Sequence, residues 1–327
     1  SLVGSEMCIR DRVWFRRDLR LQDNPALQAA LDAGHDVVPV YLHAPHEEGE
    51  WVPGAASDAW RHRSLGALDA DLRTRGSSLV LRSGDSLPAL QLLIGQTGAE
   101  AVYWNRKYEP ATQPRDATIK RTLREQGIDA QSCNGSLLFE PWDIATQQGQ
   151  PYKVFTPYWR NVLSHWRLPT LSAAPKALTA HSVDGLALDE LRLAPTLDWD
   201  SGFWEHWQPG EAGALEALSV FEDGALRGYR EQRDLPDRVG TSRLSPHLHF
   251  GEIAPWRIAH ALERLRSAGT DADIDGYLRQ LGWRDFAYHL LHHFPKTPTD
   301  NLNPRFDRFP WACLLYTSDA ADEGLGV

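Results

Sequence analysis

Three hydroxyl side chains lie within five residues of one short segment, at Thr241, Ser242 and Ser245. Arg243 stands among them, and Gly240 just before them lets another group approach the backbone closely. An apolar-periodic stretch follows, so the backbone N–H groups of a new helix would face outward with partial positive charge. Hydroxyls, an arginine and helix amides together favour binding of a diphosphate. The same residue types are also typical of a simple helix cap and turn.

Arginines crowd the sequence around this hydroxyl segment. The whole chain has 34 Lys and Arg against 44 Asp and Glu, a net charge of −10, which excludes a uniformly basic coat for nucleic acid. Locally the sign reverses, because five arginines outnumber the acidic residues Glu231, Asp234 and Asp237. The five are Arg227, Arg230, Arg233, Arg238 and Arg243. Tyr229 and Arg233 are four residues apart, which predicts that they share one helical face.

Tryptophan offers a second kind of chemistry, and the chain has 13 of them. Trp283 precedes Arg284 in a strongly apolar helical pattern over residues 273–294. Most tryptophans in such a helix pack in a core. One beside an arginine also suits stacking on a flat base, worth roughly 1–3 kcal/mol per base.

Alternating strand and helix patterns over residues 13–135 must position part of any site. Strands are expected at 13–15, 36–43, 78–84, 99–105 and 127–134, with helices at 24–34, 57–76, 86–98 and 111–127. This alternation predicts βαβ units and a doubly wound, Rossmann-like parallel sheet. The usual glycine-rich phosphate motifs are absent. The first strand instead leads into Arg16, Arg17, Asp18 and Arg20, which indicates either a surface ion network, the favoured interpretation, or a ligand site at the strand end.

The second half of the chain has a different composition and a different pattern of apolar residues. Residues 136–208 are rich in turn residues and aromatics, and we expect a long connection wrapping over one domain. Strand patterns are missing after Pro209, and helical patterns at 210–234, 251–269 and 273–294 predict an all-α domain over residues 209–311. The fold class is therefore α/β followed by all-α.

Cysteine content and hydropathy bear on the cellular compartment of the protein and on contact with membranes. Cys8, Cys133 and Cys313 are far apart and odd in number, which favours a cytosolic, reducing compartment and predicts no metal site. No apolar run approaches the roughly 20 residues needed to cross a bilayer, and the first residues lack a secretory pattern. We expect a protein without a membrane partner that acts as a monomer.

Five blocks of sequence, in order and spacing, resemble the photolyase/cryptochrome family. They are VWFRRDLRLQDNPAL, YKVFTPYWR, YREQRD, GTSRLSPHLHFGEI and QLGWRDFAYHLLHHFP, and the resemblance covers residues 13–311. It is greatest to the class I bacterial photolyases that repair cyclobutane pyrimidine dimers. The family's fold is a Rossmann-like domain, which carries an antenna chromophore, followed by a helical domain that holds FAD.

The resemblance implies roles for individual residues. For FAD it implies contacts, chiefly around the diphosphate, from Tyr229, Thr241, Ser242, Arg243, Leu244, Ser245 and Tyr277. For UV-damaged DNA it implies that Trp283 stacks on the flipped-out dimer and that Arg233 and Arg284 line the DNA and flavin cleft. It assigns no catalytic residue within this chain. The implied reaction is light-driven electron transfer from reduced FAD to the dimer, with the lesion extruded from the stack.

Three departures from the family pattern limit these expectations. Gln280 stands where dimer photolyases often have a glutamate that hydrogen-bonds the lesion. Many (6-4) photolyases and animal cryptochromes have glutamine at this position. Ala111 and Thr112 replace residues of folate-antenna enzymes, so a folate or deazaflavin antenna stays open. Residues 1–12 and 312–327 match no part of the family and are interpreted as non-native flanks. A family member would continue beyond Trp311, so we expect the chain as written to bind FAD weakly and to repair nothing.

Three other functions fit parts of the sequence. A cryptochrome photoreceptor shares all five blocks, and a (6-4) photolyase is favoured by Gln280 alone. A nucleotide-binding α/β domain joined to an unrelated helical module would require the five blocks to be accidental.

Overall fold

The structure is a computed structural model that describes residues 10–309. Five parallel strands form one sheet in the order β3-β2-β1-β4-β5. They are β1 (Arg10–Phe15), β2 (Asp36–His43), β3 (Val80–Ser83), β4 (Ala101–Asn105) and β5 (Asp129–Cys133). Every pairing is parallel, which confirms the predicted doubly wound sheet.

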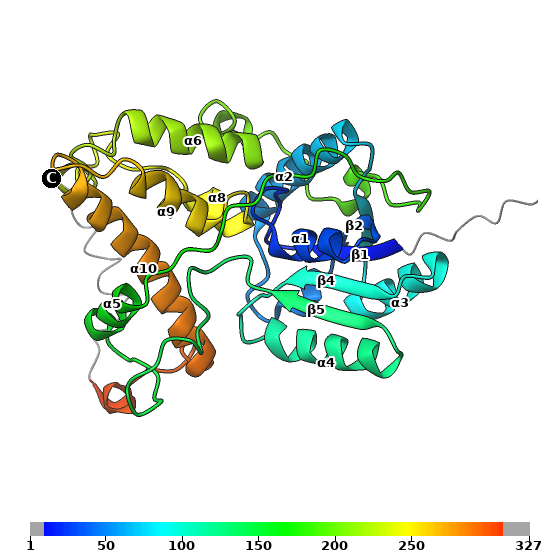
Figure 1. Cartoon of the computed structure of the whole chain (residues 1–327), viewed down its shortest axis with the longest axis horizontal. Helices are drawn as coiled ribbons and strands as arrows, with labels where there is room; N and C mark the ends of the chain where they lie inside the picture. The colour runs from blue at the N-terminus through cyan, green and yellow to red at the C-terminus, as the bar shows by residue number, and fades with distance from the viewer. Residues whose placement is uncertain (1–9, 310–327) are drawn as a thin grey trace, which may run out of the picture.

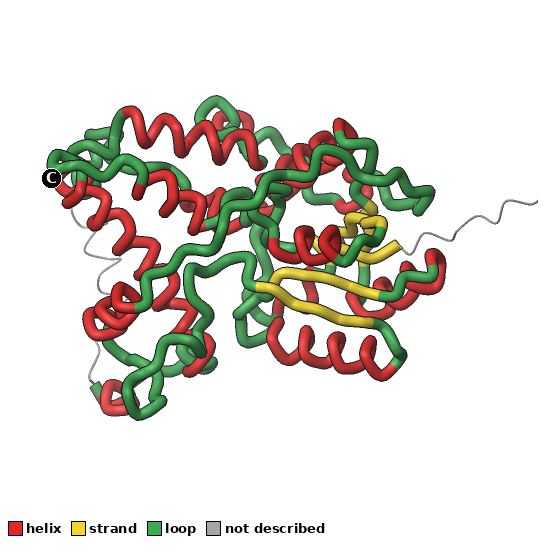
Figure 2. The backbone as a smooth tube through the Cα atoms, in the orientation of Figure 1, coloured by secondary structure: helices red, strands yellow, loops and turns green. Residues whose placement is uncertain are grey.

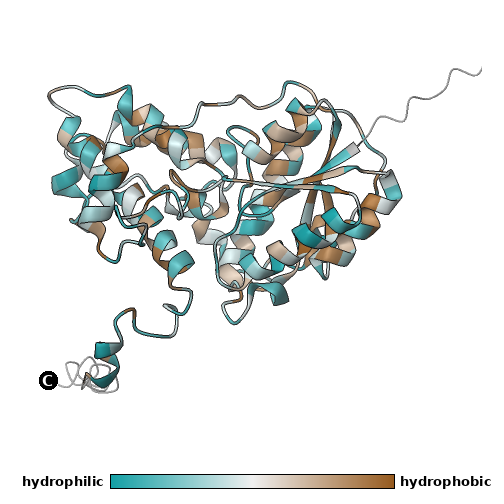
Figure 3. Cartoon of the chain, turned by 60° about the horizontal axis from the view of Figure 1, so that its bottom comes forward, coloured by the Kyte–Doolittle hydropathy of each residue, from teal (hydrophilic) through white to brown (hydrophobic). Residues whose placement is uncertain are grey.

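The sheet is covered on both faces, because its central strands are apolar on both sides. Helices α1 (Pro25–Asp32) and α2 (Ala55–Thr74) pack on one face, and α3 (Ser86–Thr97) and α4 (Thr112–Glu125) on the other. Figure 3 shows hydrophobic residues along the strands and mixed faces on the helices around them. Asn24 caps α1 by accepting from the Leu27 N–H at 3.2 Å, and Pro25 follows it.

The first strand begins three residues earlier than Val13, the start that the sequence predicted. Asp11 and Arg12 are buried although the sequence analysis assigned them to the N-terminal flank. Asp11 accepts a hydrogen bond from the Ala101 N–H at 3.0 Å, and Arg12 donates to the Leu93 carbonyl at 2.9 Å. Residues 1–9 and the tail 312–327 lie outside the described residues.

The long connection contacts both halves of the molecule, whereas the sequence predicted that it wraps over one. Its first part contains α5 (Phe155–Ser164), whose Phe155, Tyr158 and Val162 pack with Phe286 of the helical half. Its later part, around Leu191 and Leu193, packs on the α1 and α2 side of the sheet. The loop can be followed across the molecule in Figure 2.

The helical half is built from α6 (Glu211–Asp223), α7 (Tyr229–Gln232), α8 (Ser245–Phe250), α9 (Pro255–Glu263) and α10 (Asp271–His293). One continuous helical pattern was expected at 210–234, but the chain breaks between α6 and α7 at Gly224 and Gly228. Gly228 has φ of +82°, a conformation that other residues rarely adopt. In the part of the chain that the structure describes, no helix has the length and apolarity that crossing a membrane requires.

Polar side chains join the two halves at the end of β1, where the sequence favoured a surface ion network. Arg16, Asp18 and Arg20 are instead buried. Asp18 accepts from the Arg16 N–H at 2.6 Å and from the Asn105 side chain at 2.6 Å. Arg16 is covered within the α/β half, where it pairs with Asp116 of α4, whereas Arg20 donates to the Gly251 carbonyl oxygen of the helical half at 2.8 Å. Gly251, at the end of α8, comes so close to Arg17 that a Cβ would lie 2.0 Å from the Arg17 carbonyl oxygen. The segment is therefore a structural junction.

Candidate functional site

Two tyrosines and a serine come together in the core of the helical half. The rings of Tyr229 and Tyr277 lie 5.2 Å apart, edge to face, and both are buried. The Tyr277 hydroxyl is hydrogen-bonded to Ser242 Oγ at 2.8 Å. Burial raises the pKa of both tyrosines, so their hydroxyls are neutral hydrogen-bonding groups. Tyr229 therefore reaches the hydroxyl segment only through Tyr277.

The hydroxyl segment borders a hollow of about 690 Å³. Thr241, Ser242 and Arg243 line it together with Trp207 and Phe221. Arg243 has φ of +53° and its guanidinium lies 5.9 Å from the Trp207 ring centroid. The volume falls within the roughly 300–1,000 Å³ of small-molecule sites, and hydroxyl and guanidinium donors suit a diphosphate while flat aromatics suit rings.

Other residues of the predicted flavin set lie beside this hollow without lining it. Leu244 is buried and precedes α8, and Ser245, which begins α8, is exposed. Tyr229 and Tyr277 stand behind Phe221, whose ring centroid is 4.8 Å from that of Tyr277. Of the predicted set, Thr241, Ser242 and Arg243 thus face the hollow, and the two tyrosines lie in the core behind it.

A second hollow, of about 1080 Å³, opens along α10. Gln280, Trp283 and Arg233 line it. Trp283 is 45% exposed, and the ring of Phe155 lies parallel to it with centroids 3.6 Å apart. The stacked pair places one aromatic ring of α10 on a rigid support and leaves part of it open, which is how a base-stacking side chain is held.

The second hollow is mainly basic. Arginines 230, 233, 266 and 279 line it against Glu263 and Asp275. Arg266 pairs with both carboxylates, at 2.5 Å and 2.8 Å. Arg233 lies 5.8 Å from the Tyr229 ring centroid, so the expected proximity of these two residues is observed although α7 is a single turn. Arg233 also lies 3.6 Å from Asp234, and the four guanidinium groups against two lining carboxylates give this face a positive character in an acidic chain.

Arg284 is placed elsewhere. Its side chain donates to the Ser136 carbonyl oxygen at 2.5 Å and lies 5.2 Å from the Tyr288 ring centroid. One residue after Trp283 on a helix, it points about 100° away from it and borders a different hollow with Arg17 and Asp18. The structure therefore does not bring Arg284 together with Gln280 and Trp283.

Sequence reasoning missed the aromatic residues that complete both hollows. Trp159, from the YKVFTPYWR block, lines the second hollow, and Phe155 of the same block stacks on Trp283 without lining it. Trp204 and Trp207, which line the first hollow, come from the connection before α6. The resemblance of this block to the family implied no roles for its individual residues. The signal in the connection was its density of tryptophans, which composition alone could not assign to a site.

One hollow at the carboxyl edge of the sheet, where a strand-end ligand site was the alternative from the sequence, is small. A hollow there, lined by Trp14, Lys107 and Arg115 among others, has a volume of about 40 Å³. This is far below the roughly 300 Å³ of the smallest usual ligand sites. Ala111 and Thr112 lie at the start of α4, and Thr112 is buried with its hydroxyl on the Glu109 carbonyl oxygen at 3.2 Å. The identity of an antenna stays open.

Comparison with known proteins gives a consistent picture. The family model described as DNA photolyase matches residues 12–177. A deoxyribodipyrimidine photo-lyase of Agrobacterium fabrum is 44% identical over 91% of this chain and 62% of its own length. Cryptochrome-2 of Arabidopsis thaliana is 35% identical over 91% of this chain and 51% of its own length. The chain thus spans less than two thirds of these relatives.

A solved structure agrees with the sequence comparison. The crystal structure of a bacterial class III photolyase from Agrobacterium tumefaciens has a TM-score of 0.90 and 41% identity, covering 98% of this chain and 66% of that one. Its class differs from the class I resemblance expected from the sequence, and that finer assignment is therefore unsupported. An archaeal photolyase structure from Sulfolobus tokodaii, at a TM-score of 0.75 and 22% identity, shares the fold.

Proposed function

Because the chain belongs to the DNA photolyase family, we propose that the protein it forms or is part of repairs cyclobutane pyrimidine dimers in DNA with light and FAD. One observation supports this choice above all. The half-open Trp283 ring, stacked on Phe155, and the Gln280 amide line one basic hollow. A stacking surface, a hydrogen-bonding side chain and an excess of guanidinium groups over carboxylates are what an extruded, damaged pair of bases needs.

The residues of this chain would bind and orient the reactants. We propose that Thr241, Ser242 and Arg243 hold the FAD diphosphate, with Tyr277 fixing the Ser242 hydroxyl from behind. When bound, reduced FAD supplies one electron to the lesion on excitation by light. Leu244, Ser245 and Tyr229 belong to the same proposal as supporting residues.

On the DNA side, Trp283 would stack on the extruded lesion and the Gln280 amide would hydrogen-bond its polar edge. The arginines of the hollow, Arg233 among them, would contact phosphates, so affinity should fall as salt rises. Damaged bases leave the stack at lower cost than intact pairs, which gives lesion selectivity without reading of sequence. Arg284 would not contact DNA in this proposal, and its part would be to hold the connection in place through the Ser136 carbonyl oxygen.

Substitution of Trp283 by alanine should weaken binding of dimer-containing DNA by about 5- to 150-fold, the equivalent of roughly 1–3 kcal/mol of stacking. Fluorescence anisotropy of a labelled oligonucleotide with one dimer measures this. Trp283→Phe keeps a ring and should retain most of the affinity. Equal affinity of Trp283→Ala and the unsubstituted protein would remove Trp283 from the site.

The decisive test of the function is lesion-specific repair. The protein is incubated with FAD, a reductant and an oligonucleotide that carries either a cyclobutane dimer or a (6-4) photoproduct, in darkness or blue light. Light-dependent loss of the cyclobutane dimer alone supports the proposal. Loss of the (6-4) product alone would assign the Gln280 site to that lesion. Light-dependent flavin chemistry with no repair would favour blue-light sensing, which the 35% identity to a plant cryptochrome supports.

A further inference from the structure

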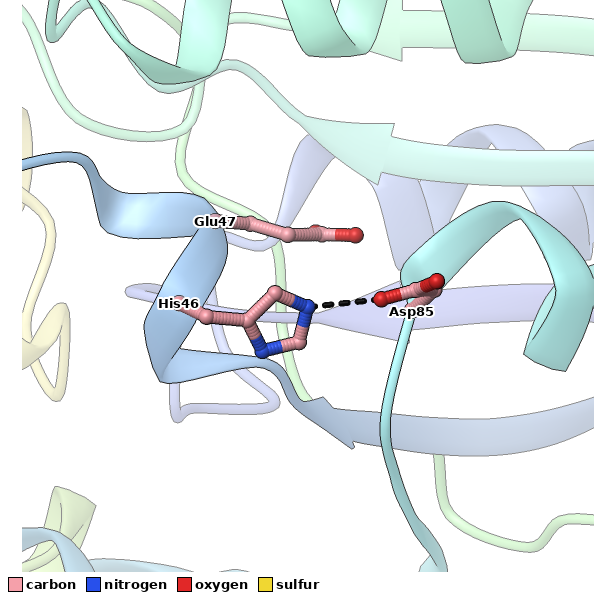
Figure 4. Close-up of side chains that lie close together, drawn as sticks. All are labelled: His46, Glu47 and Asp85. Carbon is pink, nitrogen blue, oxygen red and sulfur yellow. Dashed lines mark hydrogen bonds and ion pairs between the residues drawn. The ribbon is translucent and has the colours of Figure 1, made fainter.

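Three metal-ligating side chains meet at the carboxyl edge of the sheet, away from both hollows of the helical half. His46 and Glu47 lie on the short helix η1 (Pro45–Glu48) after β2, and Asp85 is the residue before α3. One ligand atom from each lies within 4.8 Å of the others, and among residues 10–309 this is the one group of three His, Cys, Asp or Glu so arranged. Figure 4 shows the three side chains turned toward a common point.

Asp85 occupies an N-cap position but does not cap its helix. An aspartate there ordinarily accepts a hydrogen bond from the first-turn N–H groups. No such side-chain bond is formed, and its carboxylate instead lies 2.7 Å from His46 Nε2. The capping role passes to Glu47, which accepts from the Ser86 N–H at 2.8 Å and from Ser86 Oγ at 2.6 Å. Asp85 is therefore free to face the imidazole.

Glu47 is held in place and retains capacity to bind a cation. Arg115 donates to its Oε2 at 3.1 Å, which together with Ser86 uses three of the carboxylate's four lone-pair positions. The remaining position is on Oε1. Arg115 also pairs with Asp116 at 2.6 Å, a carboxylate that it shares with Arg16, so Arg115 is fixed by contacts on both sides. Such outer contacts orient the ligands of known metal sites.

We propose that His46, Glu47 and Asp85 bind one divalent transition-metal ion, with zinc as the best match. An imidazole nitrogen with two carboxylates suits zinc, whereas magnesium prefers oxygen ligands alone. Tetrahedral zinc bonds of about 2.0–2.2 Å place ligand atoms about 3.3 Å apart. His46 and Asp85 must separate slightly from 2.7 Å, and both side chains are mobile enough to do so because they are 54% and 68% exposed. The fourth position would hold water.

The bound ion would join two segments that follow neighbouring strands. His46 and Glu47 continue from β2, and Asp85 follows β3. Linking them restrains the loops at this edge of the sheet, so zinc should raise the thermal midpoint of unfolding. The site is independent of the proposed DNA-repair function, since none of its residues lines either hollow of the helical half.

Isothermal titration of Zn²⁺ into the chelator-treated, untagged chain tests this proposal. We expect His46→Gln and Asp85→Asn each to weaken zinc binding at one site by at least roughly 10–100-fold, which is the usual effect of losing a residue that only orients a metal ligand. Each substitution should also abolish the rise in the thermal midpoint that zinc causes. The matched control is His62→Gln, because His62 pairs with the single carboxylate of Asp189 at 3.2 Å and lacks a third ligand. It should leave the titration unchanged.

Two results would overturn the site. One is a zinc titration of His46→Gln that matches the unsubstituted chain, with circular dichroism showing both folded. The other is equal competition by Mg²⁺, which would show that the imidazole contributes nothing. Because His46 and Asp85 are exposed, neither substitution threatens folding, and the comparison remains interpretable.

Discussion

Arg20→Met should lower the free energy of unfolding by about 3–5 kcal/mol, the usual loss when one partner of a buried charged network is removed. Arg20 is 1% exposed and donates to carbonyl oxygens from three parts of the chain. They are Asp23 at 2.7 Å, Gly135 at 2.8 Å and Gly251 at 2.8 Å. Methionine fills much of the same volume but leaves these acceptors without a donor, at about 1–3 kcal/mol each.

The environment of Arg20 explains why an arginine is tolerated there. Burial lowers its pKa, while the carboxylates of Asp18, Glu211 and Asp23 act in the opposite direction. Glu211 belongs to α6 and accepts from the Leu21 and Gln22 N–H groups at 2.8 Å and 3.0 Å, so it fastens the same loop from the helical half. Arg20 therefore holds the α/β half, the connection and α8 together.

Urea unfolding followed by circular dichroism measures this effect, with Arg73→Met as the matched control. Arg73 is an exposed arginine paired with Asp69 one helical turn away, at 2.7 Å. Such surface pairs contribute about 0–1 kcal/mol, so the control should unfold close to the unsubstituted chain. Equal midpoints for Arg20→Met and Arg73→Met would mean that the junction is not held by this guanidinium.

Asp285→Asn should change how stability depends on pH. Asp285 lies buried in α10 and accepts from the Leu138 N–H at 2.7 Å and the Phe139 N–H at 3.2 Å. Burial raises its pKa to about 7, against the lowering effects of Arg284 and the two N–H groups. The folded protein thus holds a proton that the unfolded chain, with an ordinary pKa near 3.8, releases.

The sign follows from linkage. A carboxyl group with a raised pKa in the folded state stabilises fully below the unfolded pKa, and this contribution is lost as pH rises through about 7. From pH 4 to pH 8 the loss from Asp285 is on the order of 4 kcal/mol at most. Asparagine keeps the acceptor oxygen and cannot ionise. Between pH 4 and pH 8 the stability of the variant, relative to the unsubstituted chain, should therefore rise by up to about 4 kcal/mol.

Urea midpoints at several pH values between 4 and 8 give the comparison. Asp198→Asn, which removes an exposed carboxyl group, should keep the slope of the unsubstituted chain. Asp285→Ala removes the acceptor as well and should be destabilised by about 2–5 kcal/mol, since two buried N–H groups lose their partner. Parallel pH curves for the asparagine variant and the unsubstituted chain would contradict a raised pKa at Asp285.

Local sequence patterns determined the kinds of element and their order. The strand at 36–43 is observed at Asp36–His43, and the helix predicted at 273–294 is observed at Asp271–His293. Both patterns depend on residues close together in the chain, namely a run of β-branched residues and an apolar repeat. The resemblance led us to expect Tyr229 and the hydroxyl segment on one cavity wall, but Tyr229 contacts Tyr277 behind that wall and Ser242 lines the hollow.

Tertiary structure alone decided which polar residues are buried and which face each hollow. Arg16, Asp18 and Arg20 were expected at the surface because local sequence does not reveal that α4 brings Asp116 to Arg16 or that the helical half covers Arg20. Trp283 and Arg284 are neighbours in sequence, yet only Trp283 faces the basic hollow, because Ser136 of the connection holds Arg284 on the other side. His46 and Asp85 are 39 residues apart and meet only because β2 and β3 are adjacent parallel strands that end at one edge. Contacts between segments far apart in the chain leave no pattern in the local sequence, so only the tertiary structure revealed them.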